Sequence, residues 1–159
     1  MLIKYVNISD QNMKNLLYLR DDQIKDCIQL LLYAYRETFS DPSEILKKNS
    51  LGAAHHRTLH LIERNQGISV NELLVKLKIT KQSLNRVLRD LKKSKIIKQI
   101  KDRNDSRRKL LYLDQIGEKF YKEIFETQKK RIFNALKNSD SESVLKFKEV
   151  LKKIINGKK

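Results

Sequence analysis

The chain has 159 residues, of which 40% are apolar, and it carries a formal net charge of +16 at neutral pH. This length suits one domain with a core of its own. No run approaches the roughly 18 apolar residues of a membrane span, and the start of the chain lacks the pattern of a secretory signal. The single cysteine, Cys27, excludes an intrachain disulfide and a four-cysteine zinc site. We therefore expect a cytoplasmic protein without a bound metal or cofactor.

The first third of the chain is predicted to be helical after residues 1–18, whose weak pattern is compatible with an arm or a short helix. From residue 21 to about Ser40, apolar residues recur at spacings of three and four. Pro42 disfavours continuation of this helix, and residues 41–44 supply the cap, proline and glutamate of a new helix that reaches about Lys48. A further helix is predicted from about Leu51 to Asn65. The apolar face of the first helix holds Ile24, Cys27, Ile28, Leu31 and Tyr35.

Residues 69–91 predict two short helices joined by a tight turn. Ser69 and Glu72 form a capping box at the start of the first helix. Thr80 is a good N-cap for the second helix, so that three residues, 78–80, separate the two. Two helices joined in this way are the pattern of a helix-turn-helix. The second helix has an apolar stripe formed by Leu84, Val87, Leu88 and Leu91.

The period of the sequence changes after Ser94. Residues 95–100 and 109–113 are short and rich in strand formers, and the polar segment 101–108 between them indicates a hairpin loop. Helical periodicity returns at Gly117 and continues to Leu136. A turn and cap at residues 138–142 then introduce a last helix with an apolar stripe. The predicted fold class is mainly α with a small β-hairpin wing.

The positive charge is concentrated in one part of the chain. Residues 81–113 carry 12 basic and 3 acidic side chains, a net charge of +9, and five of the ten arginines lie there. A general drift toward lysine would not place arginines in this way. A focused basic segment is typical of proteins that bind a polyanion. A membrane surface is a weaker alternative, because the segment is not one amphipathic helix.

The outer face of the second short helix has the side chains that read DNA. Gln and Asn can bond an adenine edge in two places, Arg can do the same for guanine, and Lys contributes phosphate contacts that set affinity and register. This face holds no acid between Lys81 and Arg89, whereas a plain solvated face would mix Glu with Lys. The residues expected at double-stranded DNA are Thr80, Lys81, Gln82, Ser83, Asn85, Arg86 and Arg89.

The predicted hairpin tip adds a second basic element. A wing can lie along the DNA backbone and insert a basic side chain into a narrow minor groove. Alone, such a tip is as well explained as a charged loop that keeps the hairpin soluble, but beside a recognition helix we expect it to touch DNA. The residues expected there are Arg103, Asn104, Arg107 and Arg108.

The wing contains a recognisable motif. Asp102, Asp105 and Arg107 stand in an Asp-x-x-Asp-x-Arg run, which residues 110–113 and Gly117 follow. This run resembles the wing of the MarR family of bacterial regulators. The resemblance implies that Asp105 braces Arg107 by an ion pair instead of touching DNA. Family wings usually have Arg at position 104 and often Thr at position 114, where this chain has Asn and Asp. The minor-groove arginine could therefore be Arg103, Arg107 or Arg108.

Residues 51–91, especially 54–57 and 79–84, are similar to the PetP-type members of the family, and the family resemblance covers roughly residues 20–155. It implies that residues 1–159 form one domain. It also implies an obligate homodimer, with N- and C-terminal dimerisation helices in 20–50 and 114–157. A winged helix-turn-helix DNA-binding lobe would occupy 51–113. The two recognition helices would enter successive major grooves of a near-palindromic operator, and an effector or oxidant often relieves such regulation. The apolar stripes of the terminal helices support dimerisation independently, since a lobe of this size cannot cover them.

Three features could sense a signal, and each has a simpler explanation. His56 and His60 are four residues apart and could share a metal, but two ligands are not a site, and a packing role is favoured. Cys27 could be a redox sensor polarised by the nearby Tyr33 and Tyr35, but its place on the apolar stripe favours burial as a small hydrophobe. By resemblance, a crevice for a small-molecule effector lies near Tyr33, His55, His56 and Arg57.

The sequence thus predicts a sequence-specific DNA-binding transcription regulator and not an enzyme, since it has no Gly-rich phosphate loop, no HExxH motif and no nucleophile–base pair. The alternative is an architectural nucleoid protein that binds DNA without sequence preference. Such a protein would use the same charge but would not need Gln82, Asn85 and Arg86 on one helix face. It would show a steep salt dependence and a small specificity ratio.

Overall fold

The computed structural model describes residues 16–105 and 107–157. They fall into two compact units, one ending at Phe39 and one beginning at Ser40. The part of the first unit that is described contains a 3-10 turn, η1 (Leu17–Leu19), and all but the last residue of the helix α2 (Asp21–Ser40). The prediction for residues 1–18 lies almost entirely outside the described residues.

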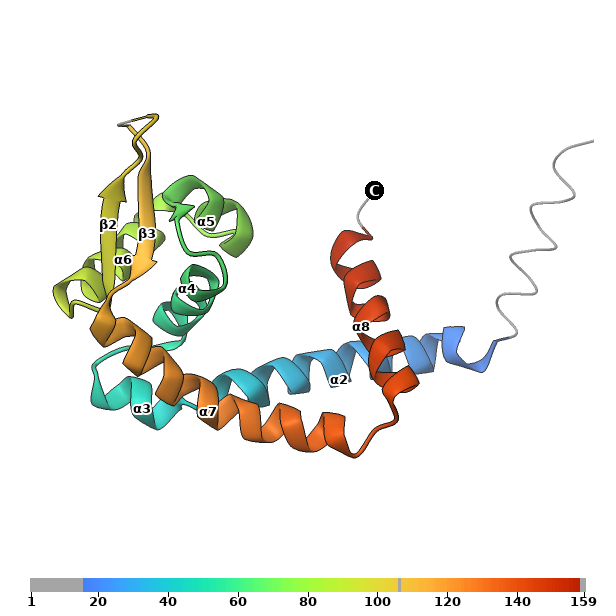
Figure 1. Ribbon diagram of the computed structural model, residues 1–159. Helices are drawn as coiled ribbons and strands as arrows, with labels where there is room; N and C mark the ends of the chain where they lie inside the picture. Colours follow the sequence, from blue (N-terminus) through green and yellow to red (C-terminus); the bar gives the residue numbers. More distant parts are fainter. Residues whose placement is uncertain (1–15, 106, 158–159) are drawn as a thin grey trace, which may run out of the picture. The chain divides into compact units, whose positions relative to one another are not determined.

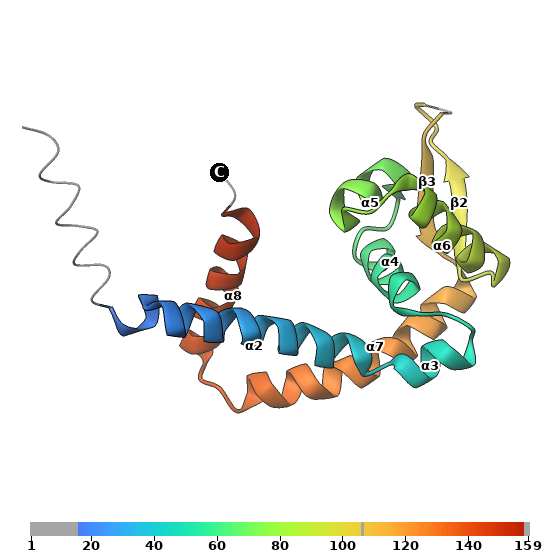
Figure 2. The ribbon, with the colours of Figure 1, turned by 180° about the vertical axis from the view of Figure 1, so that it is seen from behind.

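The second unit consists of six helices and a small sheet in the described residues (Figures 1 and 2). It is mostly helical, and the sheet forms a wing, so the predicted fold class is confirmed. The elements follow the chain in this order: α3 (Ser43–Lys48), α4 (Ala53–Arg64), β1 (Ile68–Ser69), α5 (Val70–Leu77), α6 (Lys81–Lys93), β2 (Ile97–Lys101), β3 (Lys109–Leu113), α7 (Gln115–Lys137) and α8 (Ser141–Asn156).

The sheet corrects one prediction, because it has three strands and not two. Its order is β1-β3-β2, and both pairings are antiparallel. The β2–β3 ribbon pairs Ile97 with Leu113 at its base and Lys101 with Lys109 toward its tip. The short β1 pairs Ile68 with Leu111. The wing is therefore held to the chain segment just before α5 as well as to the end of α6.

The local signals at the helix starts act as predicted in α5 and α6. Ser69 accepts a hydrogen bond from the backbone of Glu72, whose carboxylate accepts one from the Ser69 N–H, which completes the capping box. The Thr80 hydroxyl accepts from the Ser83 N–H at 3.2 Å. Lys78, in the turn between the two helices, has a positive φ of 52°. Three residues are enough to reverse the chain here because one of them adopts this left-handed conformation.

The start of α3 differs from the prediction. Pro42 occupies the N-cap position, and the first helical residue is Ser43. Asp41 does not cap the helix, because its two carboxylate oxygens accept hydrogen bonds from the Arg131 guanidinium on α7 at 2.8 and 2.7 Å. This ion pair holds the pKa of Asp41 below its usual value, chiefly through the hydrogen bond from Arg131.

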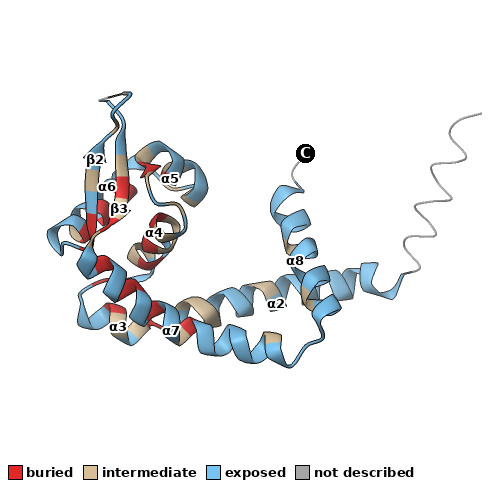
Figure 3. Cartoon of the chain, in the orientation of Figure 1, coloured by how far each residue is buried: buried red, intermediate tan, exposed pale blue. Residues whose placement is uncertain are grey.

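The core lies inside the second unit, between α3, α4, α5, α6, the sheet and the first half of α7 (Figure 3). By contrast, α2 and α8 have no buried residue. Cys27 is exposed, so the expectation that it is buried on the apolar stripe is wrong for a single chain. The most fully buried apolar side chains of the core are Leu59, Ile62, Leu73, Leu84, Leu91, Leu111 and Ile124.

Candidate nucleic-acid interface

The helix α6 has two faces of opposite character. Its apolar stripe is buried against α4 and the sheet, where it forms part of the core. The predicted DNA-reading side chains lie on the other face, and every one of them is exposed. The fold therefore separates the face that anchors the helix from the face that is free to contact a partner. The buried residues are Leu84, Val87, Leu88 and Leu91, and the exposed ones are Lys81, Gln82, Ser83, Asn85, Arg86 and Arg89.

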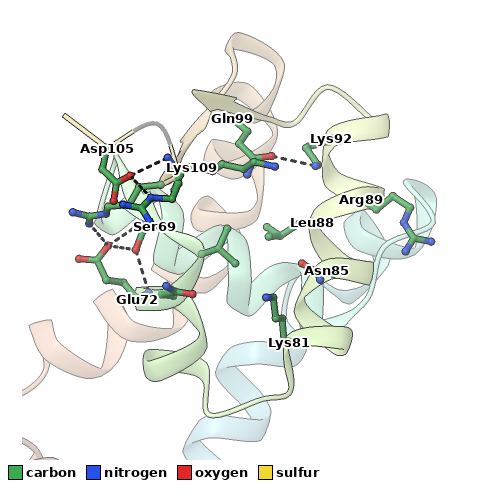
Figure 4. A pocket seen from close by; sticks show the side chains of 14 residues that line it. Ser69, Glu72, Lys81, Asn85, Leu88, Arg89, Lys92, Gln99, Asp105 and Lys109 are labelled. Atoms are coloured by element: carbon green, nitrogen blue, oxygen red, sulfur yellow. Dashed lines mark hydrogen bonds and ion pairs between the residues drawn. The ribbon is translucent and has the colours of Figure 1, made fainter. Parts of the chain in front are cut away.

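A groove of about 1080 Å³ lies between the start of α5, α6 and the β2–β3 ribbon. We call it the wing groove. Figure 4 shows Lys81, Asn85 and Leu88 of α6 on one side of it and Ser69, Glu72 and Asp105 on the opposite side. Lys92 donates a hydrogen bond to Gln99 at 3.3 Å and so links α6 to β2. The basic residues that line the groove are Lys81, Arg89, Lys92, Arg107, Arg108 and Lys109.

The wing tip is ordered by backbone contacts to its two aspartates. Asp102 accepts from the Asn104 N–H at 2.9 Å, and Asp105 accepts from the Arg107 N–H at 3.0 Å. The side chain of Arg107 also reaches Asp105, with 3.5 Å between Nε and Oδ1. This is the contact that the family resemblance implies for Asp105. The Arg107 side chain is nevertheless 94% exposed, so it projects from the tip and is accessible to a partner.

Arg108 is held differently from its neighbour. One of its guanidinium nitrogens lies 3.8 Å from Asp102, and the other lies 3.7 Å from Glu72 on α5. Its side chain is 51% exposed. The two adjacent arginines Arg107 and Arg108 are therefore not equivalent, because Arg107 is almost fully exposed beside one carboxylate and Arg108 is paired with two. Arg103 and Asn104 are exposed at the same tip.

The three histidines of α4 connect this helix to its neighbours. The His55 ring accepts from the Gly52 N–H at 3.1 Å through Nδ1, and its Nε2 lies 3.2 Å from Asp90 on α6. Because Nδ1 is an acceptor, Nε2 carries the proton, and this N–H donates a hydrogen bond to Asp90. His55 thus ties the start of α4 to α6.

The other two histidines contact α7. His56 is fully buried, and its Nε2 lies 3.2 Å from Gln128 Oε1. His60 Nδ1 lies 2.8 Å from the Tyr121 hydroxyl. Burial lowers the pKa of His60 and raises the pKa of Tyr121 to about 12. A neutral His60 then accepts the hydrogen bond that the Tyr121 hydroxyl donates. His56 and His60 have different partners, and the described residues contain no group of three His, Cys, Asp or Glu that could hold a metal.

The predicted effector crevice draws its residues from both units. Tyr33 belongs to the first unit, where it accepts a hydrogen bond from Gln29 and lies under the Arg36 guanidinium, 4.9 Å from the ring centre. In the second unit, His56 is buried, His55 is partly buried and Arg57 is exposed. The crevice stays a prediction.

Sequence reasoning misses several residues around the predicted site. It gives Glu72 only as a helix cap, and it does not single out Gln99 and Lys109 of the groove or Asp90, the partner of His55. The capping box gave a signal for Glu72, but its distance to Arg108 depends on the pairing of the ribbon. Nothing in the local sequence around Asp90 indicates that His55, 35 residues earlier, reaches it.

These features define a winged helix-turn-helix protein. The model of the family described as MarR matches residues 50–108. The chain is 36% identical over 143 residues to the HTH-type transcriptional regulator PetP of Rhodobacter capsulatus, which covers 90% of this chain and 86% of that protein. The chain therefore belongs to the MarR family of transcriptional regulators, which is not a family of enzymes.

Solved structures share the fold. One is a mutant of MepR from a multidrug-resistant S. aureus clinical isolate, with a TM-score of 0.71 at 20% identity over 82% of this chain and 96% of that chain. Another is NadR in complex with 4-hydroxyphenylacetate, with a TM-score of 0.68 at 27% identity over 80% of this chain and 91% of that chain. No helix in the described part of the chain has the length and hydrophobicity to cross a membrane.

Proposed function

We propose that this regulator is a cytoplasmic homodimer that binds double-stranded DNA sequence-specifically at a near-palindromic operator. The observation that carries the proposal is the exposed polar face of α6 beside a wing whose Arg107 projects from its tip. A recognition helix of this kind enters the major groove, and a wing contacts the flanking backbone or minor groove.

Three exposed side chains of α6 are suited to base recognition. Gln82 and Asn85 can each bond an adenine edge in two places, and Arg86 can do the same for guanine. Their helix is anchored by its buried stripe, by the Thr80 cap and by the His55–Asp90 contact. A rigidly held helix keeps these side chains in a fixed register, which base discrimination requires.

We assign the remaining polar side chains to contacts with the phosphate backbone of DNA. Lys81, Arg89, Lys92 and Lys109 line the wing groove, and the Thr80 and Ser83 hydroxyls lie at the start of α6. Such contacts position the protein and carry no sequence information. At the wing tip, Arg107 and Arg103 are favoured as minor-groove residues over Arg108, because Arg108 is already paired with two carboxylates.

The homodimer is supported by apolar surface that a single chain leaves uncovered. In α8, Leu145, Phe147, Val150, Ile154 and Ile155 are each more than half exposed. Several large apolar side chains exposed on one helix indicate an interaction site. A two-fold partner is the natural occupant, because palindromic DNA presents two equal half-sites to a protein with two-fold symmetry. In the first unit, α2 likewise has no buried residue.

The proposal is tested by selecting bound sequences from random duplex DNA and titrating the selected site against scrambled DNA at physiological salt. We expect a near-palindrome with half-sites about one helical turn apart, bound at least ~10³-fold more tightly than scrambled DNA. If no motif is enriched and all duplexes bind equally, the architectural alternative is favoured and the proposal is refuted.

A pair of variants tests the recognition helix directly. Arg86→Ala should weaken binding to the selected site by about 1–3 kcal/mol, and should weaken binding to scrambled DNA much less. Lys92→Ala is the control, because a phosphate contact should weaken both duplexes about equally. Equal losses for Arg86→Ala would show that Arg86 does not read a base.

A further inference from the structure

The wing groove contains carboxylates among its basic side chains, although a surface that binds DNA is expected to be positively charged. Six of its lining residues are basic, and its acids among the described residues are Glu72 and Asp105. Asp105 is accounted for, because it orders the wing tip through the backbone and side chain of Arg107. Glu72 lies on the same side of the groove as Asp105, across from α6, in the first turn of α5 (Figure 4).

Glu72 has two partners at once. Its Oε2 accepts a hydrogen bond from the Ser69 N–H at 2.8 Å, and the same oxygen lies 3.7 Å from Arg108 Nη2. The hydrogen bonds from Ser69, followed by the charge of Arg108, lower the pKa of Glu72. The residue is therefore a carboxylate anion at neutral pH. Its helix-capping role alone would be served equally well by glutamine, which is also found at this position of capping boxes.

The negative charge of Glu72 makes Arg108 less available to a DNA phosphate. Arg108 is paired with Glu72 on one side and Asp102 on the other, while Arg107, one residue earlier, is almost fully exposed. A DNA phosphate that approached Arg108 would have to compete with two carboxylates already present. An approaching phosphate would also meet the negative charge of Glu72 itself.

We propose that Glu72 limits phosphate binding by the wing: its carboxylate pairs with Arg108, so that the groove neutralises about one phosphate fewer than its basic residues allow. The inference rests on the proposed DNA-binding function and concerns the same groove. Because phosphate contacts are sequence-independent, such a residue restrains binding to random DNA, which competes with the operator in a cell.

The test is the salt dependence of binding to a random-sequence duplex, measured for the full chain between 50 and 200 mM salt. Each neutralised phosphate contributes about −0.9 to the slope of log K against log salt concentration. Glu72→Gln keeps the helix cap and removes the charge. We expect tighter binding, a slope steeper by about 0.9, and a gain in affinity about 3.5-fold larger at 50 mM than at 200 mM salt.

Three single variants and one double variant separate this mechanism from simpler ones. Glu44→Gln makes the same charge change on an exposed first-turn glutamate of α3 that pairs with Lys47, and it should leave the slope unchanged. Arg107→Gln should make the slope shallower by about 0.9, and Arg108→Gln should change it much less. In an Arg108→Gln background, Glu72→Gln should no longer steepen the slope.

The outcomes distinguish this inference from the proposed function. If the wild-type protein binds DNA with a normal salt slope and Glu72→Gln leaves that slope unchanged, the inference alone is wrong. Weaker binding by Glu72→Gln with an unchanged melting temperature would also overturn it, because the carboxylate would then support DNA contacts. If the wild-type protein does not bind duplex DNA, both the proposed function and the inference fail.

Discussion

Gly117 lies in the first turn of α7, against the backbone at Ile96, and alanine at this position should destabilise the second unit. A Cβ on Gly117 would overlap the carbonyl oxygen of Ile96 and lie 2.9 Å from its carbonyl carbon. That oxygen already accepts a 2.9 Å hydrogen bond from the Asp114 N–H. Both groups are backbone, so no flexible side chain can move aside, and α7 itself must shift.

The size of the effect follows from these contacts. Overpacking a closed site costs about 1–3 kcal/mol, and leaving a buried acceptor without its donor costs a further 1–3 kcal/mol or so. A shift of α7 relieves the overlap at the expense of the hydrogen bond, so the two costs do not add fully. We expect Gly117→Ala to lower the free energy of unfolding by about 3 kcal/mol, measured by urea denaturation at fixed protein concentration.

Gly52→Ala is the matched control for this prediction. No atom lies within 4 Å of a Cβ built on Gly52, and its φ of −136° is open to alanine. Alanine is a poorer helix N-cap than glycine, which lowers stability, but it also reduces the entropy of the unfolded chain, which raises stability. The free energy of unfolding should therefore change by no more than about 1 kcal/mol. If Gly117→Ala were no more destabilising than Gly52→Ala, the close approach of α7 to Ile96 would not constrain the fold.

Two further substitutions test single contacts. Thr80→Ala removes the side-chain cap of α6 and should lower the free energy of unfolding by about 1 kcal/mol. Thr80→Ser keeps a capping hydroxyl and should retain most of the stability of the wild type. Equal losses of stability for the two variants in urea denaturation would contradict the capping role. Burial lowers the pKa of His60 from its usual value near 6.5, so the unfolded state binds the proton more readily and stability should fall as the pH falls below about 6.5. His60→Gln should flatten this part of the pH profile relative to the wild type, and parallel profiles would show that His60 is not its source.

Most of the fold was predictable because its signals are local. The apolar stripe of α6, the Ser69–Glu72 box and the Thr80 cap depend only on residues within a turn or two, and the structure has the helices where these signals place them. Strand β1 was not predictable in this way. It contains only Ile68 and Ser69, and it is a strand solely because it pairs with β3 some 40 residues later.

The candidate site shows the same division. The exposed residues of α6 follow from helical periodicity, which puts Gln82, Asn85 and Arg86 opposite the buried stripe. The difference between Arg107 and Arg108 does not, because the two are adjacent in a charged loop and are chemically identical. It arises from the register of the β2–β3 ribbon, which brings Arg108 within 3.7 Å of Glu72 on another element.

The distribution of burial also bears on assembly. The lobe formed by α4, α5, α6 and the sheet closes its core within one chain, whereas α8 has an apolar stripe that nothing in the described chain buries. Burial of apolar area, at about 25 cal/mol per Å², is the main favourable term that holds a helix in place. An uncovered α8 would therefore contribute little to the stability of a single chain. If a second copy covers it, folding and association are coupled, and the stability of this helix should rise with protein concentration, while that of the DNA-binding lobe should depend on it much less.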